Sequence, residues 1–130
     1  MLLQQEYAAL SEFRYQLARF LRFSEKASRD AGITPKQYLL LLHVRGAPKA
    51  ELLTVGQLAA RLQSSHHGTV ALVSRCVTSR LVIKRRSVDD ARRVQVELTP
   101  RGQKLVERIA RRHRDELQAL RDVFRVAHVS

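Results

Sequence analysis

The chain contains little cysteine, few aromatic residues and no long apolar run. Its 130 residues include one cysteine and no tryptophan, and aromatic residues make up 5% of them. One cysteine forms no intrachain disulfide, which suits a reducing compartment. Few aromatics argue against a protein that stacks exposed bases on aromatic platforms. The longest apolar run, Tyr38 to Leu42, is far shorter than the roughly 20 residues that cross a membrane, so we expect no transmembrane helix.

Acidic residues are also scarce relative to basic ones. The chain has 24 Lys and Arg against 12 Asp and Glu, a net charge of +12. Nucleic acid or an anionic surface is the natural partner of such a charge, although a merely soluble basic protein remains an alternative at this point. With 45% hydrophobic residues, the chain is expected to fold as one domain with its own core. The first six residues do not resemble a secretory signal, and we expect a soluble cytoplasmic protein.

Positive charge is concentrated between Leu81 and Gly102. Residues 81–84 and 94–98 are predicted strands, and the second alternates apolar and polar side chains. The cations of this predicted hairpin are Lys84, Arg85, Arg86, Arg92 and Arg93. The commonest target of such a basic ribbon is a phosphate backbone.

Long amphipathic helices are predicted at both ends of the chain. In residues 2–29 the apolar positions with helical spacing are Leu3, Tyr7, Leu10, Leu17 and Leu21, with Phe13 and Phe20 beside them. Thr99 and Pro100 cap the last predicted helix. Its apolar positions are Leu105, Ile109, Leu117, Leu120 and Phe124.

Two capping boxes mark further helices in the middle of the chain. Thr34 and Gln37 form the first box, and the helix that they start is expected to end near residues 46–48. Thr54 and Gln57 form the second, for a helix that ends near Leu62. After a polar break at 63–65, residues 66–79 are predicted to form a fourth helix. Two short helices joined by a tight turn indicate a helix-turn-helix.

The fourth predicted helix has two distinct sides. Val70, Leu72, Val73, Cys76 and Val77 fall on the side expected to face the core, and His67, Gly68, Ala71, Ser74, Arg75 and Thr78 fall on the other. The second set is small or forms hydrogen bonds, as a helix in a major groove requires. An ordinary solvated surface is an equal alternative for the helix alone. The basic hairpin that follows favours a winged helix.

Several stretches resemble the MarR family of winged-helix transcription regulators in order and spacing. They are residues 33–42, 53–62 and 62–75. The most specific match is Asp90-Ala91-Arg92, followed at the usual distance by Leu98-Thr99-Pro100 and Gly102.

The resemblance implies a mainly α fold with a small β-hairpin wing (α+β). Residues 1–130 would form a single MarR-like domain. Residues 1–32 and 100–130 would be its helical dimerisation region. Residues 33–99 would be its winged helix-turn-helix DNA-binding lobe, with a recognition helix at about 66–79 and a wing at about 81–98. Two lobes of a homodimer would then reach half-sites about one DNA turn apart in a pseudo-palindromic operator.

The resemblance also implies DNA-binding residues. On the recognition helix they are Ser65, His66, His67, Gly68, Ala71, Ser74 and Arg75. On the wing, Arg92 would enter the minor groove and Asp90 would orient it, while Lys84, Arg85, Arg86 and Arg93 would hold phosphates. We expect roughly half of these flanking cations to make no measurable contact.

Three positions depart from the family pattern. Ser74 stands where relatives commonly carry Asp, so a brace between recognition helix and wing is expected to be missing. Arg80 stands where a Gly usually turns the chain, so this turn is expected to be altered or strained. Cys76 replaces a usual Leu and is interpreted as a small buried hydrophobe rather than a redox sensor.

The function expected from these features is sequence-specific transcription regulation by a homodimer, most simply a repressor that responds to a small-molecule effector. Double-stranded DNA is the expected partner, and no cofactor, metal or membrane is implied. Ligand-binding residues are not assigned. Enzyme activity is not expected, because the sequence lacks a phosphate loop, a nucleophile elbow and a placed pair of catalytic carboxylates.

Three alternatives remain open. The first is a nonspecific architectural or nucleoid DNA-binding protein, and the second is a protein-interaction module. The third is a metal- or redox-responsive winged-helix sensor, which the histidine spacing disfavours. His66 and His67 diverge on a helix, and His43, His113 and His128 are scattered.

Overall fold

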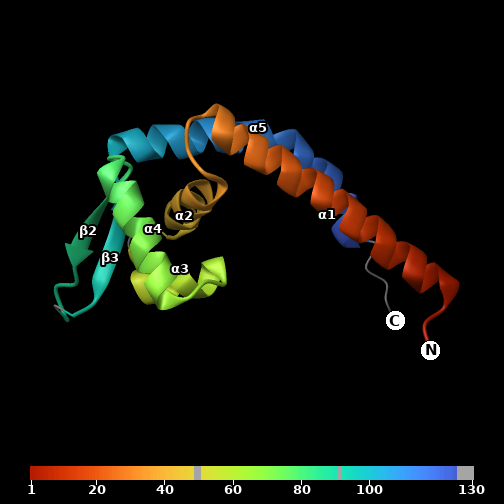
Figure 1. The fold of residues 1–130 in the computed structure, drawn as a ribbon, viewed down its shortest axis with the longest axis horizontal. Coiled ribbons are helices and arrows are strands. Elements are labelled where there is room, and N and C mark those ends of the chain that lie inside the picture. The colour runs from red at the N-terminus through yellow and green to blue at the C-terminus, as the bar shows by residue number, and fades with distance from the viewer. Residues whose placement is uncertain (49–50, 91, 126–130) are drawn as a thin grey trace.

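The computed structural model describes residues 1–48, 51–90 and 92–125, apart from the side chains of 119, 120 and 122–125. Two long helices, α1 (Gln4–Asp30) and α5 (Pro100–Arg125), lie side by side as an arm. A lobe at one end of the arm holds α2 (Pro35–Gly46), α3 (Val55–Leu62), α4 (His66–Thr78) and a small sheet (Figure 1). The prediction of a mainly helical fold with a β-hairpin is confirmed.

Side-chain caps set the starts of the three lobe helices. The Thr34 hydroxyl accepts a hydrogen bond from the Gln37 amide at 3.1 Å, and the Gln37 side chain accepts one from the Thr34 amide at 2.9 Å. Thr54 and Gln57 repeat this arrangement at the start of α3 with the same distances. Both predicted capping boxes are therefore confirmed, and each cap contributes about 1 kcal/mol of stability.

The turn between α3 and α4 depends on a left-handed residue. Gln63 ends α3 with φ 52°, and its amide and that of Ser64 donate to carbonyls of the last turn of α3. The Ser65 hydroxyl then caps α4 by accepting from the Gly68 amide at 3.0 Å. The sequence predicted a polar break here but not the left-handed residue, which is more often Gly or Asn.

The sheet has three antiparallel strands in the order β1–β3–β2. They are β1 (Leu53–Thr54), β2 (Val82–Arg86) and β3 (Val94–Leu98). Val82 faces Leu98 and Arg86 faces Val94 in the β2–β3 register, and Leu53 of β1 faces Val96. β1 was not predicted, because two residues show no alternation and they also begin a helix cap. The first wing strand was predicted to end at residue 84, which is wrong: pairing with β3 extends it to Arg86.

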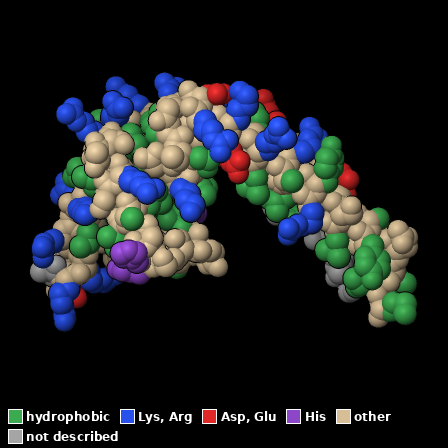
Figure 2. Space-filling model, viewed as in Figure 1, with side chains coloured by type: hydrophobic (Ala, Val, Ile, Leu, Met, Phe, Trp, Pro, Cys, Tyr) green, Lys and Arg blue, Asp and Glu red, His purple; other side chains and the backbone are tan. Residues whose placement is uncertain are grey.

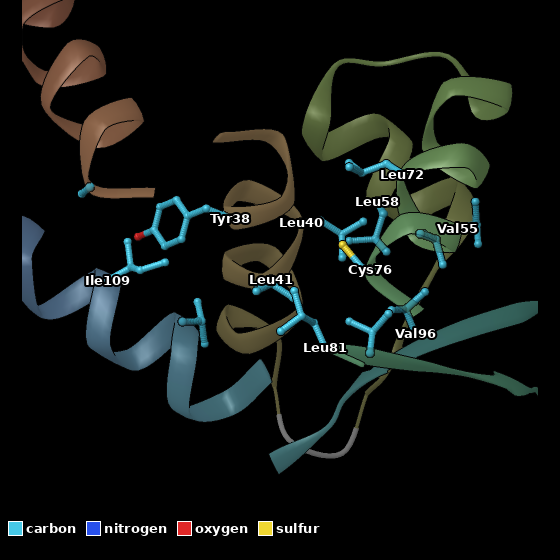
Figure 3. Packing of buried hydrophobic residues seen from close by; sticks show 14 residues of the cluster. Tyr38, Leu40, Leu41, Val55, Leu58, Leu72, Cys76, Leu81, Val96 and Ile109 are labelled. Carbon is cyan, nitrogen blue, oxygen red and sulfur yellow. The ribbon is translucent and has the colours of Figure 1, made fainter. Parts of the chain in front are cut away.

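The core of the lobe is built around α2 (Figure 3). Leu40 and Leu41 of α2, Leu58 of α3, Val73 of α4 and Val96 of β3 are all fully buried. Each such side chain contributes roughly 1.5–3 kcal/mol through removal from water. Because one core joins all these elements, the wing and α4 are held in a fixed relation.

The arm is held to the lobe by the buried face of α5. Val106 and Ile109 belong to the core, while Leu105 is half-buried against it. Leu117 is exposed. The predicted positions Leu120 and Phe124 lie outside the described side chains. No helix in the described part of the chain is long and apolar enough to cross a membrane.

Four of the five predicted apolar positions of α1 face outward, and the fifth, Leu17, is half-buried. Leu3, Tyr7, Leu10 and Leu21 are 45–58% exposed, because a different side of the helix packs on α5. On that inner side, the side chains of Phe20 and of other residues are half-buried. Helix α1 therefore has two apolar sides, and only one is covered within a single chain.

Candidate nucleic-acid interface

Helix α4 presents an exposed face and a buried face. His67, Ala71, Ser74, Arg75 and Thr78 of the predicted reading face are exposed, and Gly68 is half-buried. Small and hydrogen-bonding side chains thus remain accessible along the length of the helix.

Two assignments to the core side of α4 were wrong. Val70 and Val77 are 38% and 37% exposed, whereas Thr69 is fully buried between Leu72, Val73 and Cys76. Thr69 lies near the centre of the buried arc, and both valines lie about 80–100° away from it around the helix. The Thr69 hydroxyl donates to the Ser65 carbonyl at 2.8 Å, so its polar atom is satisfied within the helix.

Local packing explains the small residue at the start of α4. A Cβ on Gly68 would lie 3.0 Å from the Ser65 hydroxyl oxygen and 3.3 Å from that of Ser64. The Ser65 oxygen already accepts a hydrogen bond as a cap, which leaves its proton free to point outward. Ser65, His66 and His67 are exposed around this end of the helix.

The basic residues of β2 differ in their surroundings. Lys84 lines a cavity shared with α4. Arg85 forms an ion pair with Glu97 of the neighbouring strand β3. The alternation of apolar and polar residues in β3 does not by itself identify Glu97 as the partner of Arg85, because that pairing depends on the strand register. All three cations of this strand, Arg86 included, are exposed.

The tip of the wing is organised by Asp90. One carboxylate oxygen of Asp90 accepts from the Arg92 amide at 3.0 Å and lies 3.4 Å from the Arg92 Nε. The Arg93 amide donates to the Asp90 carbonyl, and the Ser87 amide donates to the Arg93 carbonyl, each at 3.0 Å. The Arg92 side chain is 93% exposed. Asp90 therefore holds the loop and directs an arginine into solvent, while Ala91 of the motif lies outside the described residues.

No ion pair in the described part of the chain joins α4 to Arg92. The Ser74 carbonyl accepts from the Thr78 hydroxyl at 3.1 Å, within the helix. A cavity of about 310 Å³ separates helix and wing instead. Valine side chains form much of the cavity wall, and the cations that line it come from the wing. The lining residues are Thr54, Val55, Gly56, His66, Val70, Val73, Lys84, Arg92, Arg93 and Val94.

The turn from α4 into β2 contains a residue in the left-handed conformation that is not a glycine. Arg80 has φ 61°, and its carbonyl accepts from the Thr99 hydroxyl at 2.7 Å. A left-handed residue with a Cβ costs roughly 1–2 kcal/mol. The expected strain at Arg80 is thus present in the backbone, and the surrounding hydrogen bonds hold it.

Cys76 is fully buried, and burial raises the pKa of its thiol to about 11. A thiol that stays protonated and inaccessible behaves as a small hydrophobe rather than a reactive nucleophile. Among the residues that the structure describes, no three His, Cys, Asp or Glu side chains are grouped to hold a metal ion. His128 lies outside these residues.

Comparison with known proteins agrees with this geometry. The sequence model of the MarR family matches residues 31–93, which run from the end of α1 into the second half of the wing. AbsC, a MarR family transcriptional regulator from Streptomyces coelicolor, has a TM-score of 0.74 at 18% identity over 95% of this chain and 81% of that one. Wild-type MarR from E. coli has a TM-score of 0.72 at 20% identity over 92% and 83% of the two chains.

A mutant MepR from S. aureus, bound to an oligodeoxyribonucleotide, has a TM-score of 0.70 at 22% identity over 99% of this chain and 86% of that one. None of the curated protein sequences matches the chain. The fold and its exposed helix and hairpin define a winged helix-turn-helix protein. Within that class, the matches confirm the resemblance to the MarR family.

Proposed function

We propose that the protein is a homodimeric repressor, without catalytic activity, that binds a pseudo-palindromic operator in the cytoplasm and responds to a small molecule. One observation carries the DNA-binding part of the proposal. Helix α4, through His66, Val70 and Val73, and the exposed Arg92 side chain line the same cavity of one lobe. A helix and a ribbon tip in this relation suit adjacent major and minor grooves.

Sequence reading is proposed for α4. Arg75 can donate two hydrogen bonds to a guanine, His67 and Ser74 can meet base edges, and the Ala71 methyl can touch a thymine. Gly68 lets the first turn approach the groove closely. Ser65 and His66 would contact the flanking phosphates.

Positioning is proposed for the wing. Arg92 enters the minor groove, where negative potential is concentrated, and Asp90 keeps it oriented. Lys84, Arg86 and Arg93 face phosphates. Arg85 contributes less, because Glu97 already neutralises it.

The uncovered side of α1 supports the dimer. Leu3, Tyr7, Leu10 and Leu21 form an exposed apolar row on a helix already packed on its other side. A two-fold partner would cover two such rows with the same contacts. The two lobes would then be placed for half-sites about one DNA turn apart.

The effector is proposed to be a small amphipathic anion. In the cavity between α4 and the wing, valine side chains could contact an apolar ring of the ligand. Lys84, Arg92 and Arg93 could bind its carboxylate. Its volume of about 310 Å³ lies at the small end of the range for ligand sites. A ligand there would compete with DNA for Arg92. A thermal-shift screen of small aromatic acids tests this, because a ligand that binds only the folded state raises the melting temperature.

Selection of bound duplexes from a random pool, with titration at several salt concentrations, tests the regulator. Enrichment of a two-fold symmetric site is expected. Steep salt dependence without an enriched sequence would instead indicate an architectural binder, which the net charge of +12 also suits. Absence of binding at low salt would contradict both and favour a protein-interaction module.

A further inference from the structure

Helix α5 carries a second basic surface outside the winged helix. Arg101, Lys104, Arg108 and Arg111 are all exposed and follow one another at intervals of three, four and three residues. At about 100° and 1.5 Å per residue they fall within an arc of about 80° and a length of about 15 Å. We call these four residues the α5 stripe.

No carboxylate in the described part of the chain forms an ion pair with the α5 stripe. Other cations of the arm and lobe do form ion pairs. Arg112, the next residue along, lies 3.4 Å from the Asp30 carboxylate, and Arg45 lies 3.6 Å from Glu107. Neighbouring members of the stripe are about 4.5–6 Å apart along the helix axis, inside the Debye length of about 8 Å. They therefore repel one another, and an anion would relieve that repulsion.

The local sequence of α5 also runs against helix stability. The first turn holds no acidic residue, although carboxylates are the side chains favoured there. Arg101 and Lys104 stand near this end instead. Such conflict between a local preference and the residues present is typical of functional surfaces.

All four members of the stripe line a single groove. The groove encloses about 980 Å³, and its opposite wall comes from the end of α1 and the segment after α4, including Gly32, Ile33 and Ser79. Glu107 is its acidic lining residue, and Arg45 already neutralises it. An elongated anion could thus lie along the stripe and contact several cations at once.

The groove is separate from the proposed operator-binding surface. Helix α5 begins directly after β3, at the end of the hairpin opposite its tip (Figure 1). A five-residue strand spans roughly 17 Å. Figure 2 shows Lys and Arg side chains along the edge formed by the arm, away from the histidines and the wing tip. One duplex seated at α4 and Arg92 would therefore leave this surface open.

We propose that the α5 stripe binds the phosphates of a second segment of duplex DNA. Three of its four members are arginines, whose forked guanidinium matches phosphate oxygens. A row of about 15 Å can span a major groove of about 12 Å and reach phosphates on both rims. The inference rests on the proposed function, since operator binding supplies the first duplex and raises the local concentration of neighbouring DNA. The protein would hold two DNA segments together.

A capture experiment tests the proposal with the full chain. A short operator duplex is attached to beads, the protein is added with excess operator so that every winged helix is filled, and a labelled duplex without the operator sequence is offered. Wild type is expected to retain the labelled duplex. The triple variant Arg101→Gln/Arg108→Gln/Arg111→Gln is expected to retain about tenfold less, because three phosphate contacts are lost, while its operator affinity changes by less than about twofold.

A matched variant controls for net charge. Arg19→Gln/Arg22→Gln/Arg114→Gln removes three exposed cations of the arm that do not line the groove, and it is expected to behave as wild type. Equal capture by the two triple variants, or no capture by wild type, would overturn the proposal. Labelled poly-glutamate retained in place of DNA would overturn it in favour of an acidic protein partner.

A second measurement tests the second DNA site independently of the proposed function as a transcription regulator. Fluorescence anisotropy with the non-operator duplex alone compares the two triple variants whether or not an operator exists. If the selection from a random pool enriched no symmetric site, the proposed function would be contradicted, but the comparison of the two triple variants would still be valid. Equal affinities of the two triple variants for the non-operator duplex would contradict only the proposed second DNA site.

Discussion

Gly102, in the first turn of α5, lies directly against the carbonyl group of Leu81 at the start of the wing. A Cβ at position 102 would overlap the Leu81 carbonyl oxygen. Leu81 is held there by the Thr99 amide, which donates to that same oxygen at 3.0 Å. Gly102, which follows Leu98-Thr99-Pro100 in the stretch that resembles the MarR family, is thus required because two backbones approach closely there and neither segment can shift alone.

Gly102→Ala is therefore expected to destabilise the protein. Overpacking against backbone costs about 2–3 kcal/mol in the free energy of unfolding, measured by urea denaturation. Gly46→Ala is the control, because a Cβ there meets nothing within 4 Å. That variant is expected to be neutral or more stable by up to about 1 kcal/mol. Equal stabilities for the two variants would show that the contact at Gly102 yields easily.

A buried histidine joins the arm to the lobe. The His113 ring stacks on Tyr38, with centroids 5.2 Å and planes 9° apart, and packs edge-on against Phe20 and Phe23. Its Nδ1 donates to the Ile109 carbonyl at 2.8 Å. Its Nε2 is buried without a hydrogen-bond partner among the described residues.

His113→Phe is expected to change the free energy of unfolding by less than about 1 kcal/mol, because the lost hydrogen bond is offset by removal of an unsatisfied nitrogen. His113→Ala is expected to cost about 2–4 kcal/mol, since a cavity opens among the aromatic rings. Thermal and urea unfolding distinguish these outcomes. If His113→Phe lowered the free energy of unfolding as much as His113→Ala does, the imidazole nitrogens would be shown to stabilise the cluster.

Arg92→Ala is expected to weaken operator binding by roughly 1–3 kcal/mol, about 5–150-fold in Kd, through loss of the minor-groove contact. The melting temperature should not change, because the side chain is almost fully exposed. Electrophoretic mobility shift with the selected operator measures the effect. Arg85→Ala is the matched control on the same wing and should matter less, since Glu97 already pairs with Arg85. An unchanged affinity with Arg92→Ala would make the wing assignment wrong.

His67→Ala is expected to act on specificity rather than on total affinity. His67 is exposed on the proposed reading face of α4. Loss of one base-edge contact relaxes the preference at one position of the operator by about 1–3 kcal/mol. Repeating the selection from the random pool reveals the relaxed position. An unaltered consensus would remove His67 from the reading face.

Because the thiol of Cys76 has a raised pKa, we expect the protein to lose stability at high pH. Burial raises its pKa from 9.0 to about 11, so the unfolded thiol loses its proton near pH 9 while the folded one keeps it. Ionisation then favours the unfolded state, and stability is lost between about pH 9 and 11. Relative to Cys76→Val, wild type is expected to lose about 2 kcal/mol over this range. A constant difference between the two proteins would contradict the raised pKa.

Leu10→Glu tests the dimer. A charge in the exposed apolar row of α1 would be buried unpaired in a two-fold interface, so the variant is expected to sediment as a monomer while wild type sediments as a dimer. Val88→Glu, at a fully exposed wing position, should leave the dimer intact. A monomeric wild type would contradict the proposal.

Much of the lobe could be predicted from the sequence because its signals are local. Thr34 with Gln37 and Thr54 with Gln57 are complete within four residues, and the structure contains both boxes. The motif around Asp90 and Arg92 is equally local, since the carboxylate reaches an amide two residues away. Their roles on DNA remain predictions.

Other features depended on contacts between distant residues. β1 exists only because Leu53 and Thr54 pair with β3, about 40 residues later in the sequence. The pairing of Arg85 with Glu97 requires the strand register. Val70 was misassigned because an ideal wheel gives the spacing of side chains but not the width of the buried arc, which the neighbouring elements set.

The sequence by itself determined the helices of the lobe, the hairpin and the excess of positive charge, because caps, periodicity and composition act over short distances. Tertiary structure decided which apolar side of α1 is covered, how the wing stands relative to α4, and that Arg101, Lys104, Arg108 and Arg111 line one groove. These depend on packing between segments far apart in the chain. That packing is fixed only when the whole core forms.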